Sequence, residues 1–88
     1  MDIVITERAI RFLATLPDKD RRIVGEHIDR LNAHPHTHGD IERLAMPKER
    51  YRMHVSHRYT VFFYPAGQEI VINDIMTIEQ AHKKYGRI

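Results

Sequence analysis

The 88-residue sequence contains no cysteine, so the chain can form neither a disulfide bond nor a thiolate metal site. It has no apolar run long enough to span a bilayer, and residues 1–5 contain no basic segment like the one that begins a signal peptide. Repeats, low-complexity segments and linkers are absent as well. We therefore expect a cytoplasmic protein that does not enter a membrane, with residues 1–88 forming one domain around one modest core.

A large excess of charge of one sign is also missing, because the net charge is only +2. The distribution of charge is nevertheless uneven. Residues 1–47 contain seven Lys/Arg and eight Asp/Glu, whereas residues 48–88 contain seven and four. This asymmetry either indicates an anionic partner for the C-terminal half or is an ordinary fluctuation over so short a segment.

The N-terminal half predicts one short strand followed by two helices. Residues 3–5 form an apolar β-branched run, and Thr6 can cap the helix that comes next. Apolar residues then recur at helical spacing until Pro17 ends the helix. A second amphipathic helix is predicted to begin at residues 18–20 and to end near Asn32. The short connection between the two predicts an antiparallel helical hairpin.

The C-terminal half predicts three successive strands. Their residues are rich in β-branched and aromatic side chains, and short turns separate them. Residues 41–44, ahead of these strands, are expected to form a short turn that brings Leu44 inward. The tail, residues 78–88, is expected to be either a short helix or an extended arm. The predicted strands cover residues 51–55, 58–64 and 69–75.

This order predicts an α+β fold, β-α-α-β-β-β, with the helical hairpin packed on one face of a small, mainly antiparallel sheet. The other face is expected to stay open. Alternation along the first predicted strand of the C-terminal half places Tyr51, Met53 and Val55 on the apolar face. Arg52 and His54 then lie on the open face. Arginine binds phosphate and histidine transfers protons near neutral pH, so the open face is predicted to be a site.

A histidine-rich loop offers a second constellation. His34, His36 and His38 occupy every second position, and Asp40 is close by. Such residues could bind zinc or nickel if the loop kept strand geometry. No fourth ligand with suitable spacing stands out, so the histidines are read as solvated loop residues. We therefore expect no metal and no other cofactor.

Short segments over nearly the whole chain share an order and spacing with a known group of proteins. The segments are Arg8–Leu13 with Leu16-Pro17, Asp20–Ile23, Ile28–Leu31, Pro35–Asp40 with Leu44, Tyr51-Arg52, Arg58-Tyr59 ahead of aromatic residues, Ile70–Ile72 and Ala81–Tyr85. Taken together, they resemble the toxins of the RelE/ParE superfamily, from type II toxin–antitoxin systems. The resemblance is closer to the RelE-like mRNA interferases.

The resemblance implies the β-α-α-β-β-β fold and a tight complex with a cognate antitoxin. The expected antitoxin contacts are the apolar margins of the helices around Phe12, Leu16 and Val24, although core packing is the preferred reading for each of these residues taken singly. For RelE-like members the resemblance implies a ribosome-dependent endoribonuclease that cuts mRNA in the ribosomal A site and so inhibits translation. That reaction needs no metal, because the 2′-hydroxyl attacks the adjacent phosphate and the 5′-oxygen leaves. The alternatives are a ParE-like inhibitor of DNA gyrase, which is not an enzyme, and an inactive homologue that only binds an antitoxin.

The RelE-like reaction requires cations near the phosphate, together with an acid and a base. Arg52 and Arg58 are the candidates for stabilising charge on the phosphate. His54, His82 and Tyr85 are the candidates for proton transfer, and Tyr85 could act as a base only if neighbouring cations lowered its pKa. Further RNA or phosphate contacts are expected from Lys48, Arg50, Lys83, Lys84 and Arg87.

Each of these residues also has a simpler alternative. His54 could be a bystander beside Arg52, Tyr85 could be a C-terminal anchor that packs on the sheet, and Lys83 and Lys84 could be a solvated terminus. Arg52 could instead pair with Glu69 or Glu79 as an ordinary strand residue. Arg58 precedes Tyr59, whereas the family usually has the tyrosine first. A shift of one residue moves a strand side chain to the opposite face. Arg58 therefore faces the site only if a bulge or a longer turn restores its direction.

Overall fold

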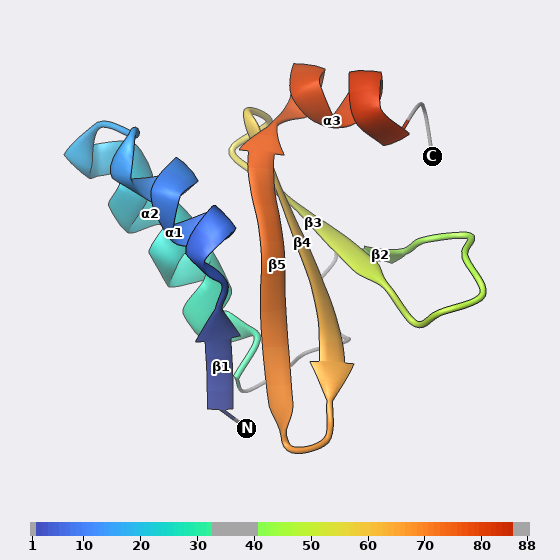
Figure 1. The fold of residues 1–88 in the computed structure, drawn as a ribbon. Coiled ribbons are helices and arrows are strands. Elements are labelled where there is room, and N and C mark those ends of the chain that lie inside the picture. The colour runs from blue at the N-terminus through green and yellow to red at the C-terminus, as the bar shows by residue number, and fades with distance from the viewer. Residues whose placement is uncertain (1, 33–40, 86–88) are drawn as a thin grey trace.

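The structure, a computed structural model, describes residues 2–32 and 41–85. The predicted α+β fold is confirmed: two helices follow the first strand, and the later strands complete a five-stranded sheet (Figure 1). The tail adopts the first of its two predicted forms, a short helix. The elements are β1 (Asp2–Ile5), α1 (Glu7–Ala14), α2 (Asp18–Arg30), β2 (Ile41–Arg43), β3 (Tyr51–Val55), β4 (Tyr59–Ala66), β5 (Glu69–Thr77) and α3 (Ile78–Tyr85).

The sheet has the strand order β1-β5-β4-β3-β2. β1 runs parallel to β5, and the other neighbouring strands are antiparallel, as predicted for a mainly antiparallel sheet. In Figure 1, α1 and α2 lie along one side of the sheet, whereas α3 turns over the other side where β5 ends. Among the described residues, none of these helices is long and apolar enough to cross a membrane.

The main core lies between the helical hairpin and one face of the sheet. The Thr6 side chain caps α1 by accepting a hydrogen bond from the backbone N–H of Ala9. Val24 of α2 is completely buried, so it is a core residue and not an exposed antitoxin contact. Phe12 and Leu16 are half-buried and pack against the same core. The buried members of the core are Ala9, Val24, Ile28, Leu31, Met53, Val55, Tyr59, Val61, Phe63, Ile70, Ile72 and Ile75.

The turn predicted over residues 41–44 is wrong. Ile41–Arg43 forms strand β2, which pairs antiparallel with β3 so that Glu42 lies opposite Arg52. A strand of three residues is too short to show alternation in the sequence. It forms because the outer edge of β3 offers backbone hydrogen-bonding groups that need partners. Leu44 points inward as predicted, with 4% of its surface exposed.

The face predicted to stay open is partly covered. A second, smaller apolar cluster lies there, made of Leu44, Phe62, Met76 and Ala81. Ala81 belongs to α3, so this helix packs on the sheet face opposite the helical hairpin. These residues come from β4, β5, α3 and the segment just after β2, and no local pattern in the sequence indicates that they meet. The remaining polar side chains of this face therefore lie beside α3, not on a bare sheet.

The turn between β3 and β4 places two ordinary residues in the left-handed region. Ser56 has φ 54° and His57 has φ 53°, and the N–H of Arg58 closes the turn on the carbonyl of Val55 at 3.1 Å. The turn between β4 and β5 uses glycine at such a position, Gly67 with φ 61°. A non-glycine residue in this conformation costs roughly 1–2 kcal/mol because its Cβ approaches the carbonyl oxygen. The β3–β4 turn therefore holds backbone strain.

His57→Gly is expected to raise the free energy of unfolding by about 1 kcal/mol, because removing the Cβ relieves more strain than the added unfolded-state entropy costs. Urea denaturation would show a higher midpoint with an unchanged m-value. The matched control is Gly67→Ala, which adds a Cβ at the same kind of φ and is expected to lower the midpoint. A midpoint unchanged by His57→Gly would show that the turn is not strained.

Candidate functional site

Arg52 projects from β3 on the face opposite the main core, as predicted. Only 9% of its side chain is exposed, and its Nη2 donates a hydrogen bond to Oε2 of Glu42 at 2.8 Å. The partner is therefore Glu42 on β2, and neither Glu69 nor Glu79. The hydrogen bond from Arg52, followed by its charge, lowers the pKa of the Glu42 carboxyl below its ordinary value of 4.5. The arginine is held in place by a carboxylate that an incoming phosphate would have to replace or join.

The lowered pKa of Glu42 gives a pH dependence with a definite sign. A carboxyl with a lowered folded-state pKa stabilises the fold above its ordinary pKa, 4.5, and loses this contribution as the pH falls through the folded value. With 57% of the Glu42 side chain exposed, the contribution is expected to be about 0.5 kcal/mol. Urea denaturation should show wild type more stable than Glu42→Gln at pH 7, and this difference should shrink as the pH is lowered below 4.5. A difference that persists unchanged in acid would contradict this assignment.

The residues beside Arg52 and His54 are mostly uncharged. Across the sheet, Arg52 is paired with Phe62 on β4, and His54 is paired with Thr60. The same two rows continue on β5 as Asp74 and Met76, which lie opposite Phe62 and Thr60. In these rows of the described sheet the cationic and imidazole side chains come from β3 alone, whereas Glu42 on β2 and Asp74 on β5 supply carboxylates. Any additional cation must come from another part of the molecule.

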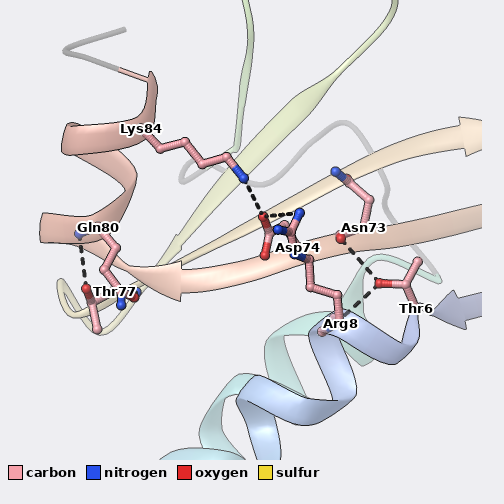
Figure 2. Close-up of polar contacts among 8 residues, drawn as sticks. Thr6, Arg8, Asn73, Asp74, Thr77, Gln80 and Lys84 are labelled. Carbon is pink, nitrogen blue, oxygen red and sulfur yellow. Dashed lines mark hydrogen bonds and ion pairs between the residues drawn. The ribbon is translucent and has the colours of Figure 1, made fainter.

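Helix α3 brings further cations to this face. It begins with a capping box in which the Gln80 side chain accepts from the Thr77 N–H at 3.0 Å and the Thr77 hydroxyl accepts from the Gln80 N–H at 3.1 Å (Figure 2). The helix carries His82 and Lys83, which are exposed, and Lys84. Tyr85 is the last residue of α3. Arg87 and the histidine loop, residues 34–40, lie outside the described residues.

Asp74 is a buried carboxylate that sequence reasoning missed. Only 8% of its side chain is exposed, and Oδ2 lies 3.5 Å from Nζ of Lys84 and 3.7 Å from Nη1 of Arg8. Figure 2 shows the two cations reaching Asp74 from opposite sides, from α3 and from α1. The carboxylate therefore joins both helices to β5. A single aspartate in an otherwise apolar strand indicates a buried charge that needs partners. The sequence does not reveal those partners, because the tertiary fold determines them.

Arg58 is placed away from Arg52. It lies in the turn before β4, 71% of its side chain is exposed, and Nη1 is 3.8 Å from Oδ2 of Asp20 on α2. The same carboxylate accepts a hydrogen bond from the Tyr59 hydroxyl at 2.6 Å. This hydrogen bond raises the pKa of the Tyr59 phenol, and burial adds to the effect. Since α2 covers the other face of the sheet, Asp20 attracts Arg58 toward the helical hairpin.

The segment before β3 supplies the remaining predicted phosphate contacts. Lys48 is exposed, whereas Arg50 is half-buried with its guanidinium 4.0 Å from the centroid of the Tyr64 ring. Arg50 also lines a cavity of about 110 Å³ together with Phe62 and Asn73. Arg52 and His54 thus lie on the sheet face on which α3 packs against β4 and β5, with Arg50 at its margin. The structure does not bring Arg58 to that group.

Comparison with solved structures identifies the fold. The RelE–RelB complex of Pyrococcus horikoshii OT3 contains a chain with a TM-score of 0.75 and 21% identity, matching 86% of this chain and 92% of its own length. In the RelB–RelE complex of Methanococcus jannaschii the TM-score is 0.74 at 14% identity, over 93% of this chain and 98% of that one.

The isolated E. coli RelE toxin gives a TM-score of 0.73 at 13% identity, over 94% of this chain and 96% of that one. No protein-family model matches the sequence, and no curated protein matches it either. The structural agreement extends over nearly the whole length of both chains in each comparison, as the resemblance in sequence led us to expect. This chain therefore has the fold of the RelE toxins.

Proposed function

We propose that this protein is the toxin of a type II toxin–antitoxin system and that it cleaves mRNA in the ribosomal A site, which inhibits translation in the cytoplasm. The proposal is supported by a fold shared with RelE toxins over 86% and 94% of this chain in two of the comparisons. The observation that carries the chemical part is the grouping of Arg52, His54 and α3 on one sheet face. Cations and imidazoles on one face are what cleavage of an RNA phosphate requires.

In the proposed reaction the RNA supplies its own nucleophile. The 2′-hydroxyl loses its proton to a base, its oxygen bonds to the adjacent phosphorus, and the bond from phosphorus to the 5′-oxygen breaks. The leaving 5′-oxygen takes a proton from an acid. Arg52 stabilises the charge that grows on the non-bridging oxygens, because its planar guanidinium donates paired hydrogen bonds. No metal is required for any of these steps.

Proton transfer is assigned to His54, His82 and Tyr85. An imidazole has an ordinary pKa near neutrality and can either accept or donate a proton there. His54 is fixed on β3 beside Arg52, whereas His82 is carried by α3. Tyr85, also on α3, would act as a base only with its pKa lowered by cations such as Lys83 and Lys84. Together with Lys48, Arg50 and Arg87, these lysines would contact the RNA backbone.

The proposed protein partner is a cognate antitoxin. Both archaeal structures compared above are complexes of RelE with RelB. Within the described residues, the helical hairpin exposes Ile10, with 53% of its surface accessible. An apolar side chain exposed on a short amphipathic helix is a suitable contact for a wrapping partner segment.

A second candidate is a protein that binds but does not cleave. The observation in its favour is the composition of the site face, where β4 and β5 provide Thr60, Phe62, Asp74 and Met76 beside an arginine that already binds a carboxylate. Such a face could serve an interface, either with DNA gyrase or with an antitoxin alone. An interface of this kind would explain why, in the described sheet, β4 and β5 carry no cation in the rows of Arg52 and His54.

Expression of the protein in cells, followed by primer extension on cellular mRNA, separates these candidates. The proposed function gives cut transcripts and rapid loss of translation, and the purified protein cuts mRNA only when ribosomes are added. DNA damage signalling with intact transcripts would instead indicate gyrase inhibition. Normal growth together with tight binding to an acidic partner encoded by the neighbouring gene would indicate an inactive homologue.

A further inference from the structure

The cavity beside Arg50 has no role in the reaction proposed above. Leu44 and Phe62, each only 4% exposed, provide apolar surface, and Met46 is also in its lining. Its volume of about 110 Å³ exceeds that of a single water molecule. At roughly 30 Å³ for each molecule of liquid water, the space suits about four waters or part of a flat ring.

Asn73 brings an amide group to this cavity. It is the extra residue of a β-bulge, because Phe62 pairs with Asp74 whereas Phe63 pairs with Ile72. Bulges redirect side chains, and Figure 2 shows the Asn73 side chain directed away from α1 while its backbone oxygen accepts from Thr6. The side-chain Oδ1 is buried, and within residues 2–32 and 41–85 it has no hydrogen-bond partner. A buried acceptor without a donor is costly, so a ligand with an N–H group would be favoured.

Arg50 gives the cavity a cationic margin. Its guanidinium lies over the Tyr64 ring and donates to the backbone oxygen of Glu49 at 3.1 Å, so the charge is held near the opening. Lys48 is exposed two residues earlier. A ligand that combines a flat ring bearing N–H groups with a negative charge would satisfy the apolar surface, the amide and the cation together.

We propose that this cavity is a subsite for one RNA base, with Asn73 hydrogen-bonded to the edge of the base and Arg50 contacting the adjoining phosphate. The inference rests on the proposed action on RNA and specifies where one base is bound. A nucleobase has apolar faces for Leu44 and Phe62 and has donors at its edge. An apolar side chain of a protein partner would fill the same space but leave the Asn73 oxygen without a donor.

NMR titration of the protein with the four nucleoside monophosphates and with short single-stranded RNA tests the subsite without ribosomes. The Asn73 side-chain amide signals are expected to shift, most strongly with adenine, because asparagine pairs with adenine through two hydrogen bonds. Asn73→Leu is expected to weaken adenosine monophosphate binding by about 10-fold and to remove the base preference. The matched control, Gln68→Leu in the exposed β4–β5 turn, is expected to bind as wild type does.

A second variant keeps the shape of the side chain. Asn73→Asp accepts hydrogen bonds but cannot donate them, so the preference is expected to move from adenine toward cytosine. RNA binding of equal strength and without base preference in wild type and Asn73→Leu would overturn the subsite while leaving RNA binding in place. A shift of the Asn73 amide signals on addition of an antitoxin peptide, but not of nucleotides, would also overturn it. Base-selective binding by a protein that cuts no mRNA would support the subsite and disprove the nuclease.

Discussion

Arg52→Ala is expected to lower ribosome-dependent mRNA cleavage by about 10²–10³-fold, the usual effect of removing one group that stabilises transition-state charge. Arg52 is the one arginine fixed on the site face of the sheet in the described part of the chain, with its guanidinium positioned by Glu42 at 2.8 Å. Folding should survive, because the Glu42 side chain released by the change is 57% exposed and can be solvated. Cleavage would be measured by primer extension in a purified translation system.

Three further variants separate the roles of charge, geometry and fold. Arg52→Lys keeps the charge but loses the planar pair of donors, so cleavage should recover only partly. Glu42→Gln removes a carboxylate that repels phosphate, and RNA binding at low salt should strengthen several-fold. Arg43→Ala removes an exposed arginine from β2 and serves as the matched control, with activity close to wild type. Normal cleavage by a folded Arg52→Ala protein would contradict the assignment of the site.

The fold could be predicted because its signals are local. Helical spacing followed by Pro17 defines α1, the stripe that contains Val24 defines α2, and strict alternation over residues 51–55 defines β3. Short connections then leave few topologies to consider. Errors are limited to places where tertiary contacts decide the structure. Strand β2 has only three residues, and it forms because it pairs with the edge of β3. The residues of β2 alone do not indicate this pairing.

The candidate site was predictable to a smaller extent. The face on which Arg52 lies follows from alternation, but its partner Glu42 does not, because that contact depends on β2 being a strand. The exchanged order of Arg58 and Tyr59 left open whether the Arg58 side chain faces the site. The register answers it by pairing Tyr59 with Val55, which leaves Arg58 in the turn next to α2. Contacts between distant elements, such as those at Asp74, have no signal in a single sequence.

Ala81→Asp is expected to detach α3 from the sheet and to lower mRNA cleavage by at least about 10²-fold, the cost of misplacing reacting groups by about 1 Å or more. Ala81 is only 5% exposed and packs among Phe62 and Met76. A carboxylate buried there without a partner costs several kcal/mol, and a helix of eight residues has few other contacts to compensate. Hydrogen exchange over residues 78–85 should rise toward that of an unfolded peptide.

The main core contains no residue of α3, so the remainder of the domain should still unfold cooperatively in this variant. Ala14→Asp on the exposed side of α1 is the matched control and should change neither hydrogen exchange in α3 nor cleavage. If Ala81→Asp frees α3 yet cleaves normally, then His82 and Tyr85 take no part in the reaction and the proton transfers belong to His54. If cleavage is lost with α3, the site requires both β3 and α3, and Asp74 and Ala81 act by holding the helix against the sheet.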